Sequence, residues 1–358
     1  MWIDTVCIDK KSSAELTEAI NSMFRWYSFA QICFAHLADV VVTGRSPEEI
    51  GTQFRQSRWF TRGWTLQELI APGDVIFVDR DWQVIGTKNQ QFVDARRLSG
   101  MGPMTGVIAS ITQIPVDVLS GITRQNLALY SVAQRMSWAA KRYTTRAEDL
   151  AYCLLGIFGI NMPLLYGEGR NAFRRLQEAL LRGASDSVFA WRPRGEVVSG
   201  ELREAGMLAR SPAAFADAGS IVDVGASSGW FLSPKGSGFQ LEVHVSNPVP
   251  MVFKHRVHGH FLVRLQCSRV GKEADKLEPC VMILRQTDCG HLQRAFDAGV
   301  FTEYDLLDPK QYEPQKDVKT LYVHATKQDH LHCKGRLARV AHRHSVDWPL
   351  SNALLPQS

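Results

Sequence analysis

The chain has 358 residues, enough for two or three domains, and its 45% hydrophobic and 22% charged residues are typical of a globular protein. A net charge of +5 is modest for this length and does not by itself indicate nucleic-acid binding. Seven cysteines without a Cys-x-x-Cys pair argue against a disulfide framework, and the longest apolar stretch is too interrupted to span a bilayer. We therefore expect a cytoplasmic protein without a membrane segment.

The N-terminal part predicts a strand, a helix and a second strand. Residues 2–8 form a mostly apolar run, which predicts a buried strand of a parallel sheet. Ser12 with Glu15 three residues later is typical of a helix N-terminus, and apolar side chains at helical spacing follow. Residues 32–37 predict the second strand. Strand, helix and strand in this order indicate an open parallel α/β sheet.

Helical segments and a further strand follow. Pro47 begins one helix, and residues 62–72 predict another that stops at its final proline. Residues 74–85 are strand-like, with a continuous apolar run near their start. Residues 87–183 have mainly helical periodicity.

The composition changes near residue 195, where Gly, Ser and Pro become frequent and β-branched runs replace helical periodicity. Short strands are predicted over residues 221–224, 239–245, 261–267, 280–284 and 320–323. We therefore expect an α/β domain, a helical extension packed on it, a β-rich domain and a tail, over residues 1–85, 86–190, 196–345 and 346–358 respectively.

Trp64 and Glu68 lie four residues apart in the helix predicted over residues 62–72. At this spacing both side chains project from one face of the helix, one turn apart. A carboxylate beside an indole can contact the polar and the apolar part of one ligand. The spacing also arises often by chance, in which case Trp64 packs in the core and Glu68 is a surface or capping residue.

Acidic residues follow two predicted strands. Asp9 and Asp39 come near the carboxyl ends of these strands, where open α/β sheets bind ligands, and each could bind a ribose hydroxyl. The alternative is that each caps a turn or a helix. Asp4 lies inside the first predicted strand, so its burial would require a partner such as Arg58 or Arg62. Arg62 could also bind phosphate.

Two further patterns are weak. The sequence Tyr166-Gly167-Glu168-Gly169 precedes a predicted helix and could present amides to an anion, although a tight turn explains it equally simply. Cysteine and histidine side chains between residues 280 and 344 match no standard zinc spacing, so we predict no metal site. The basic side chains that follow residue 333 are expected to be solvated rather than bound to nucleic acid.

Three blocks together resemble the fungal heterokaryon-incompatibility (HET) domain family. The first is WIDTVCID at residues 2–9, and the second is SRWFTRGWTLQEL at residues 57–69. The third comprises RMSWAA at residues 135–140 and MPLLYGEG at residues 162–169, with TTR and ED between them. The blocks cover most of residues 1–190, and the β-rich remainder resembles the tail that often follows in this family.

The resemblance implies a TIR-like, flavodoxin-like sheet, because HET domains are thought to be similar to TIR domains. Many TIR domains hydrolyse NAD, and their catalytic glutamate lies four residues after a tryptophan, as Glu68 does after Trp64. The resemblance thus implies Glu68 as the catalytic residue. Trp64, Asp9, Asp39 and Arg62, singled out above from their positions in the sequence, are the candidate substrate-binding residues. NAD would be a substrate, and no cofactor is expected.

The family's role is non-self recognition that leads to programmed cell death. The expected partners are further copies of the chain or another incompatibility protein. Members of the family usually carry an earlier motif of the Tyr-x-x-Leu-Ser-x-x-Trp type, whereas this chain starts at the second motif. Two alternatives to an enzyme therefore stay open: a non-enzymatic, self-associating signalling module, and an inactive, truncated relic.

Overall fold

The computed structural model describes residues 2–89, 103–121, 124–181, 186–192, 207–224, 230–235, 238–243, 252–255, 260–271, 277–286, 292–294, 301–302, 312–314 and 320–324. The chain divides into two compact units. The first comprises Met1–Glu196, Leu208–Gly225 and Leu265–Cys280, and the second comprises Val197–Met207, Ala226–Arg264 and Val281–Ser358. The predicted tail at residues 346–358 and the histidines at residues 330–344 lie outside the described residues.

The first unit contains a three-stranded sheet in the order β1 (Cys33–Leu37), β2 (Val75–Asp79), β3 (Val84–Thr87). Strands β1 and β2 are parallel, whereas β2 and β3 are antiparallel. The strand predicted over residues 32–37 is confirmed. The sheet is mixed rather than purely parallel, because a short turn returns the chain from β2 directly into β3. The Asp79 carboxylate stabilises this turn by accepting the backbone N–H groups of Asp81 and Gln83 at 2.9 and 2.8 Å.

The strand predicted over residues 2–8 is wrong. The structure forms a short helix there, α1 (Asp4–Cys7), none of whose residues is buried. The indole of Trp2 packs edge-on against Trp26 and Tyr27, with ring centroids 5.4 and 5.6 Å away. Trp2 therefore packs on the following helix, α2, instead of pairing in the sheet.

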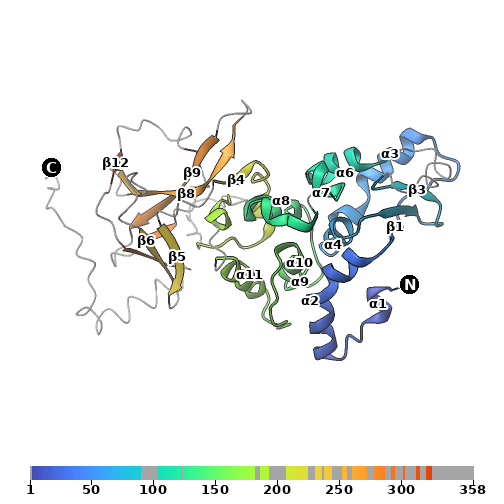
Figure 1. The fold of residues 1–358 in the computed structure, drawn as a ribbon, viewed down its shortest axis with the longest axis horizontal. Helices are drawn as coiled ribbons and strands as arrows, with labels where there is room; N and C mark the ends of the chain where they lie inside the picture. The colour runs from blue at the N-terminus through green and yellow to red at the C-terminus, as the bar shows by residue number, and fades with distance from the viewer. Residues whose placement is uncertain are drawn as a thin grey trace, which may run out of the picture. The chain divides into compact units, whose positions relative to one another are not determined.

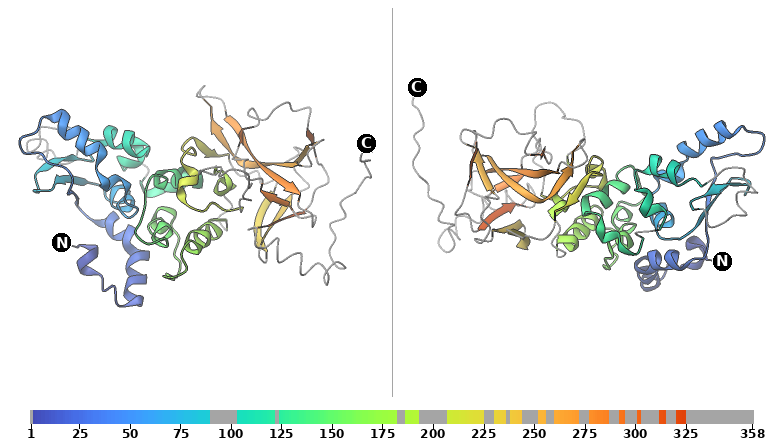
Figure 2. Two further views of the ribbon diagram at one scale, coloured as in Figure 1. Left: turned by 180° about the vertical axis from the view of Figure 1, so that it is seen from behind. Right: turned by 45° about the horizontal axis from the view of Figure 1, so that its top comes forward.

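Helix α2 (Ser13–Phe29) begins as predicted, since the Ser12 hydroxyl accepts the backbone N–H of Glu15. The Glu15 carboxylate bonds the N–H of Asp9 at 2.9 Å, so the helix end is also tied to the preceding turn. Helix α2 packs against α4 (Thr65–Ile70) and α10 (Leu155–Phe158). In the views of Figures 1 and 2, the three-stranded sheet lies between α3 (Pro47–Gln56) and the helices α1 and α2.

The remaining helices of the first unit are α6 (Thr105–Thr112), α7 (Val116–Leu119), α8 (Val132–Ala139), α9 (Asp149–Tyr152) and α11 (Asn171–Leu181), with the 3-10 helices η1 (Arg58–Thr61), η2 (Arg124–Leu129), η3 (Asp186–Phe189) and η4 (Pro212–Phe215). The helical content predicted for this stretch is confirmed where it is described. No helix in the described part of the chain is long and apolar enough to cross a membrane.

An aromatic cluster forms the core beside the sheet. Phe54 of α3, Trp59 and Phe60 of η1, and Phe77 of β2 contact one another with ring centroids 5.1 to 6.2 Å apart. Phe54 and Phe77 are fully buried. Edge-on aromatic contacts of this kind add to the stabilisation that comes from burying apolar surface. The cluster fixes η1 next to the end of β1.

The second unit is β-rich, as predicted. Its strands are β5 (Trp230–Lys235), β6 (Gly238–Val243), β7 (Val252–His255), β10 (Leu292–Arg294), β11 (Phe301–Thr302), β12 (Tyr312–Pro314) and β13 (Thr320–His324), while β8 (His260–Val270) and β9 (Leu277–Gln286) are divided between the units. The sheet order is β12-β7-β8-β9-β10-β13-β6-β5. In the first unit, β4 (Ile221–Asp223) pairs with Cys267–Arg269 of β8.

Candidate functional site

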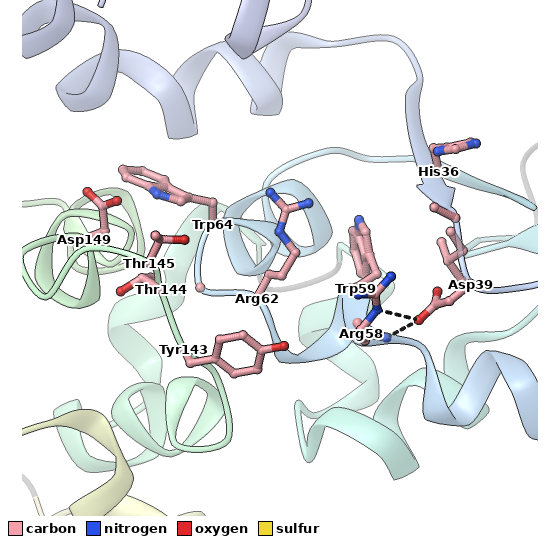
Figure 3. A pocket seen from close by; sticks show the side chains of 13 residues that line it. His36, Asp39, Arg58, Trp59, Arg62, Trp64, Tyr143, Thr144, Thr145 and Asp149 are labelled. Atoms are coloured by element: carbon pink, nitrogen blue, oxygen red, sulfur yellow. Dashed lines mark hydrogen bonds and ion pairs between the residues drawn. The ribbon is translucent and has the colours of Figure 1, made fainter. Parts of the chain in front are cut away.

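A cavity of about 330 Å³ opens in the first unit at the carboxyl end of β1 (Figure 3). Three chain segments line it: residues 36–39 at the end of β1, residues 58, 59 and 62–64 around η1, and residues 143–145 together with Asp149. Ligands of α/β proteins commonly bind beyond the carboxyl ends of parallel strands. A cavity of this size lies at the lower end of the range for small-molecule sites.

Asp39 lies at one end of the cavity, where the chain leaves β1 (Figure 3). Its carboxylate accepts the Ser57 hydroxyl at 2.7 Å and the backbone N–H of Arg58 at 2.8 Å, and it forms an ion pair with the Arg58 guanidinium at 3.5 Å. Although partial burial opposes the effect, these hydrogen bonds hold the pKa of Asp39 below its usual value. Asp39 thus anchors the start of η1 to the sheet.

Asp149 and Trp64 lie at the opposite end (Figure 3). The Asp149 carboxylate accepts the Tyr166 hydroxyl at 2.9 Å, and the Trp64 side chain lies near it at this end of the cavity (Figure 3). Burial raises the pKa of Asp149, while the Tyr166 hydrogen bond and the polar edge of Trp64 oppose the shift. The carboxylate that shares this end of the cavity with Trp64 is therefore Asp149 and not Glu68 on its own helix.

Two segments far apart in the sequence meet in the wall of the cavity. The backbone N–H of Gly63 donates to the carbonyl of Tyr143 at 2.9 Å, and the N–H of Tyr143 donates to the carbonyl of Thr61 at 2.8 Å. A Cβ atom on Gly63 would lie 2.4 Å from Cγ2 of Thr144. Glycine is therefore needed at position 63 for this close approach. The arrangement places the exposed Arg62 between the two ends of the cavity (Figure 3).

Glu68 is partly buried on α4 and is not one of the residues that line this cavity. Burial and the nearby Asp4 carboxylate raise the pKa of Glu68 to about 7, against the guanidinium charges of Arg62 and Arg142 and the polar edge of Trp59. Because Arg62 and Trp59 both line the cavity, Glu68 lies close to two of its lining residues.

Arg142 is a second cationic residue close to Glu68. This side chain is buried, and its Nη1 donates to the carbonyl of Arg62 at 2.9 Å and to the hydroxyl of Thr65 at 2.8 Å. Burial lowers the pKa of Arg142 to about 10, which leaves the group cationic at neutral pH. The guanidinium therefore fixes the backbone at the start of α4 and supplies positive charge near Glu68.

The predicted site residues thus occupy three different places. Trp64, Asp39 and Arg62 line the cavity, and Glu68 lies close to Arg62. Asp9 is exposed in the turn between α1 and α2, where its Oδ1 accepts the N–H of Lys11 at 2.8 Å. It does not follow a strand, because the preceding segment is helical. Asp9 is not a lining residue of the cavity.

Sequence reasoning missed Asp149, Tyr143 and Thr145, which also line the cavity. Asp149 belongs to the acidic pair in the third HET-like block, but nothing in its local pattern connects it with Trp64. That contact arises only because residues 143–149 fold back onto the start of α4. The hydrogen bonds between Gly63, Tyr143 and Thr61 establish this approach.

The backbone amides of the turn at residues 166–169 are bound by a carboxylate of the chain itself. The Glu148 carboxylate accepts the backbone N–H groups of Gly167 and Gly169 at 2.8 and 2.9 Å, so it occupies the position that an anion would take. The backbone N–H of Glu148 itself and those of Gly169 and Gly167 hold the pKa of Glu148 below its usual value. In the described part of the chain, no three His, Cys, Asp or Glu side chains lie close enough together to hold a metal ion.

The chemistry of the cavity suits a ligand with anionic, hydroxyl and aromatic groups. Arg58 and Arg62 supply positive charge, and guanidinium groups bind phosphate oxygens well. Trp64 and Tyr143 offer aromatic surface, and Asp149 offers acceptors for hydroxyl groups. A nucleotide carries all three kinds of group.

Over 193 residues, the chain is 44% identical to the protein named vegetative incompatibility protein HET-E-1 of Podospora anserina. The similarity covers 53% of this chain but only 13% of that much longer protein. No protein-family model matches the chain, and no solved structure matches it. The activity and partners of the longer protein therefore do not transfer to this chain by similarity alone.

Proposed function

We propose that the chain acts in fungal vegetative incompatibility and that its first unit cleaves NAD between nicotinamide and ribose. The similarity to the Podospora anserina incompatibility protein supports the biological role, for the segment that the two proteins share. The proximity of Glu68 to Arg62, which lines the cavity, together with its pKa of about 7, supports the activity. Its Trp64–Glu68 spacing is also that of the TIR catalytic helix.

The reaction requires stabilisation of positive charge on the sugar. Loss of nicotinamide leaves an oxocarbenium-like centre at the anomeric carbon, as in glycoside hydrolysis. A carboxylate close to this carbon lowers the barrier by electrostatic stabilisation. The bond to the cationic nicotinamide nitrogen breaks with its electron pair going to nitrogen, and water supplies the hydroxyl group and releases a proton. Neutral nicotinamide and ADP-ribose are the products.

The cationic neighbour Arg62 fits a role of Glu68 in stabilising charge on the sugar. Arg62 interacts electrostatically with Glu68 and also lines the cavity. A ligand phosphate that binds Arg62 would draw this guanidinium toward the cavity. Glu68 would then face the sugar rather than the arginine.

A non-enzymatic signalling module is the second candidate function. One observation favours it: Glu68 does not itself line the cavity. Apolar side chains that self-association could cover are also exposed, with 77% of Val6, 78% of Phe29 and 50% of Phe34 accessible. In this case cell death would follow from assembly, and the carboxylate would be dispensable.

Expression in a fungal host distinguishes these two functions. The parent chain, Glu68→Gln and Glu18→Gln are compared for cell viability and cellular NAD, where Glu18 is an exposed glutamate on α2 and serves as the matched control. For the enzyme, we expect the parent and Glu18→Gln to deplete NAD and kill cells, and Glu68→Gln to do neither. The signalling module would be favoured if Glu68→Gln still killed cells at equal protein level and Phe29→Ser did not.

A further inference from the structure

Two carboxylates line the cavity, those of Asp39 and Asp149, and they differ in the number of hydrogen bonds and ion pairs that they already form. Asp39 accepts the Ser57 hydroxyl and the Arg58 N–H, and it also pairs with the Arg58 guanidinium. These contacts hold η1 in place, so Asp39 has a structural task. Asp149 has no ion pair within 4.0 Å among the described residues. It is therefore the carboxylate with capacity left for a ligand.

One hydrogen bond fixes the Asp149 side chain and leaves most of its acceptor positions open. The Tyr166 hydroxyl donates to Oδ1 at 2.9 Å. An ionised carboxylate can accept about four hydrogen bonds. About three acceptor positions therefore remain, and the cavity is where they can be used. The donor is an aromatic side chain with few rotamers, so it restrains the carboxylate before a ligand arrives.

The two ends of the cavity differ in charge. Asp149 and Trp64 lie at one end, Asp39 and Arg58 lie at the other, and Arg62 lies between them (Figure 3). A phosphate group is repelled by Asp149 and attracted to Arg62 and Arg58. A pair of neighbouring hydroxyl groups suits the Asp149 end, because each hydroxyl can donate one hydrogen bond to the carboxylate.

We propose that Asp149 binds the 2′,3′-diol of the ribose attached to nicotinamide, with Tyr166 as the positioning residue that holds its carboxylate. This inference rests on the proposed NAD-cleaving function and assigns a different task to each acidic side chain. Asp149 orients the sugar in the cavity, and Glu68 stabilises the charge that develops on it.

Binding of nicotinamide mononucleotide tests the inference separately from cleavage. Affinity is measured by calorimetry in a Glu68→Gln chain, with and without Asp149→Asn, for the mononucleotide and for its 2′-deoxy analogue. Loss of a hydrogen bond to a charged group weakens binding roughly tenfold. We expect Asp149→Asn to weaken binding of the mononucleotide by about this factor and to leave binding of the 2′-deoxy analogue much less affected.

The matched control is Asp117→Asn. Asp117 also accepts a hydrogen bond from a tyrosine hydroxyl, that of Tyr130, but it does not line the cavity. We expect this variant to bind the mononucleotide as the parent does. If Asp149→Asn fails to fold, Tyr166→Phe removes the positioning hydrogen bond and should weaken mononucleotide binding roughly threefold.

Three results would overturn the inference. Adding Asp149→Asn to the Glu68→Gln chain could leave its affinity for the mononucleotide unchanged, or could lower its affinity for both ligands equally. The Glu68→Gln chain could also bind neither ligand. Nicotinamide release by the chain without these substitutions is measured in parallel. Absent release together with Asp149-dependent binding would reject the cleavage activity alone. Release that Asp149→Asn leaves unchanged, in rate and in KM, would reject the role of Asp149 alone.

Discussion

The hydroxyl of Tyr166 donates a hydrogen bond of 2.9 Å to the carboxylate of Asp149. This contact connects α9 with the turn that precedes α11, and the Tyr166 ring also packs edge-on against Tyr152 with ring centroids 5.4 Å apart. A carboxylate in the cavity is therefore held by a side chain of the turn at residues 166–169. The turn itself is organised by Glu148, the neighbour of Asp149 in sequence.

Replacing Tyr166 by Phe should shift the pH dependence of ligand binding. The Tyr166 hydrogen bond favours the ionised form of Asp149, so its loss raises the pKa of Asp149 further. The acidic limb of mononucleotide affinity should move to higher pH, and affinity at neutral pH should fall roughly threefold. Calorimetry across pH 4 to 8 measures both effects, with Tyr130→Phe as the matched control. An unchanged profile would show that Tyr166 does not act through Asp149.

Glu68 should make the folded chain less stable as the pH rises. Its pKa increases from 4.5 to about 7 on folding, so between these values the folded chain holds a proton that the unfolded chain has lost. The free energy of unfolding should therefore fall through this window. Glu68→Gln cannot titrate at this position, so its free energy of unfolding should not show this fall. The variant should therefore become progressively more stable than the parent as the pH rises from 5 to 8. Urea unfolding measures the difference, and a difference independent of pH would contradict the assigned shift.

Gly156 should tolerate no side chain, because a Cβ atom there would lie 2.1 Å from Cβ of Phe24. Gly156→Ala must separate α10 from α2, and overpacking of this kind costs about 1–3 kcal/mol. Gly51, within α3, is the matched control, since a Cβ atom there would meet nothing within 4 Å. Gly51→Ala should raise the free energy of unfolding by roughly 0.5–1 kcal/mol. Equal effects of the two substitutions would argue against the close packing of α2 and α10.

Lys88 should contribute strongly to stability although it is a fully buried cation. Its Nζ donates to the carbonyls of Leu69 and Pro72 at 2.8 and 2.6 Å, which caps the C-terminal end of α4. Lys88→Met leaves these carbonyls without this donor and should lower the free energy of unfolding by about 2 kcal/mol or more. Lys141→Met, at an exposed lysine, should change it by less than about 0.5 kcal/mol. Equal stabilities of the two variants would contradict this capping role.

Much of the secondary structure was predictable, because local patterns specify it. The strand at residues 32–37 and the N-terminus of α2 depend on neighbouring residues alone, and both are confirmed. The segment at residues 2–8 was mispredicted as a strand, since an apolar run does not reveal which surface will cover it. In the structure, Trp2 packs on Trp26 and Tyr27 of α2. Periodicity cannot separate a short buried strand from a short helix that packs in this way.

The cavity was only partly predictable. Asp39 follows a strand, and Trp64 and Arg62 lie in a recognisable block, so their types and positions indicated a site. The partnership of Trp64 with Asp149 was hidden, because it depends on a contact between segments about eighty residues apart. The raised pKa of Glu68 was hidden for the same reason, since Asp4, Arg62 and Arg142 come from three separate segments.

The most direct measurement is nicotinamide release from NAD by the purified chain at high protein concentration, with Glu68→Gln and Glu18→Gln measured in parallel. An enzyme that uses Glu68 predicts release by the parent and by Glu18→Gln, with a loss of about a hundredfold or more in Glu68→Gln. Release that is equal in the parent and Glu68→Gln, or no release by any of the three chains, would contradict the proposed activity.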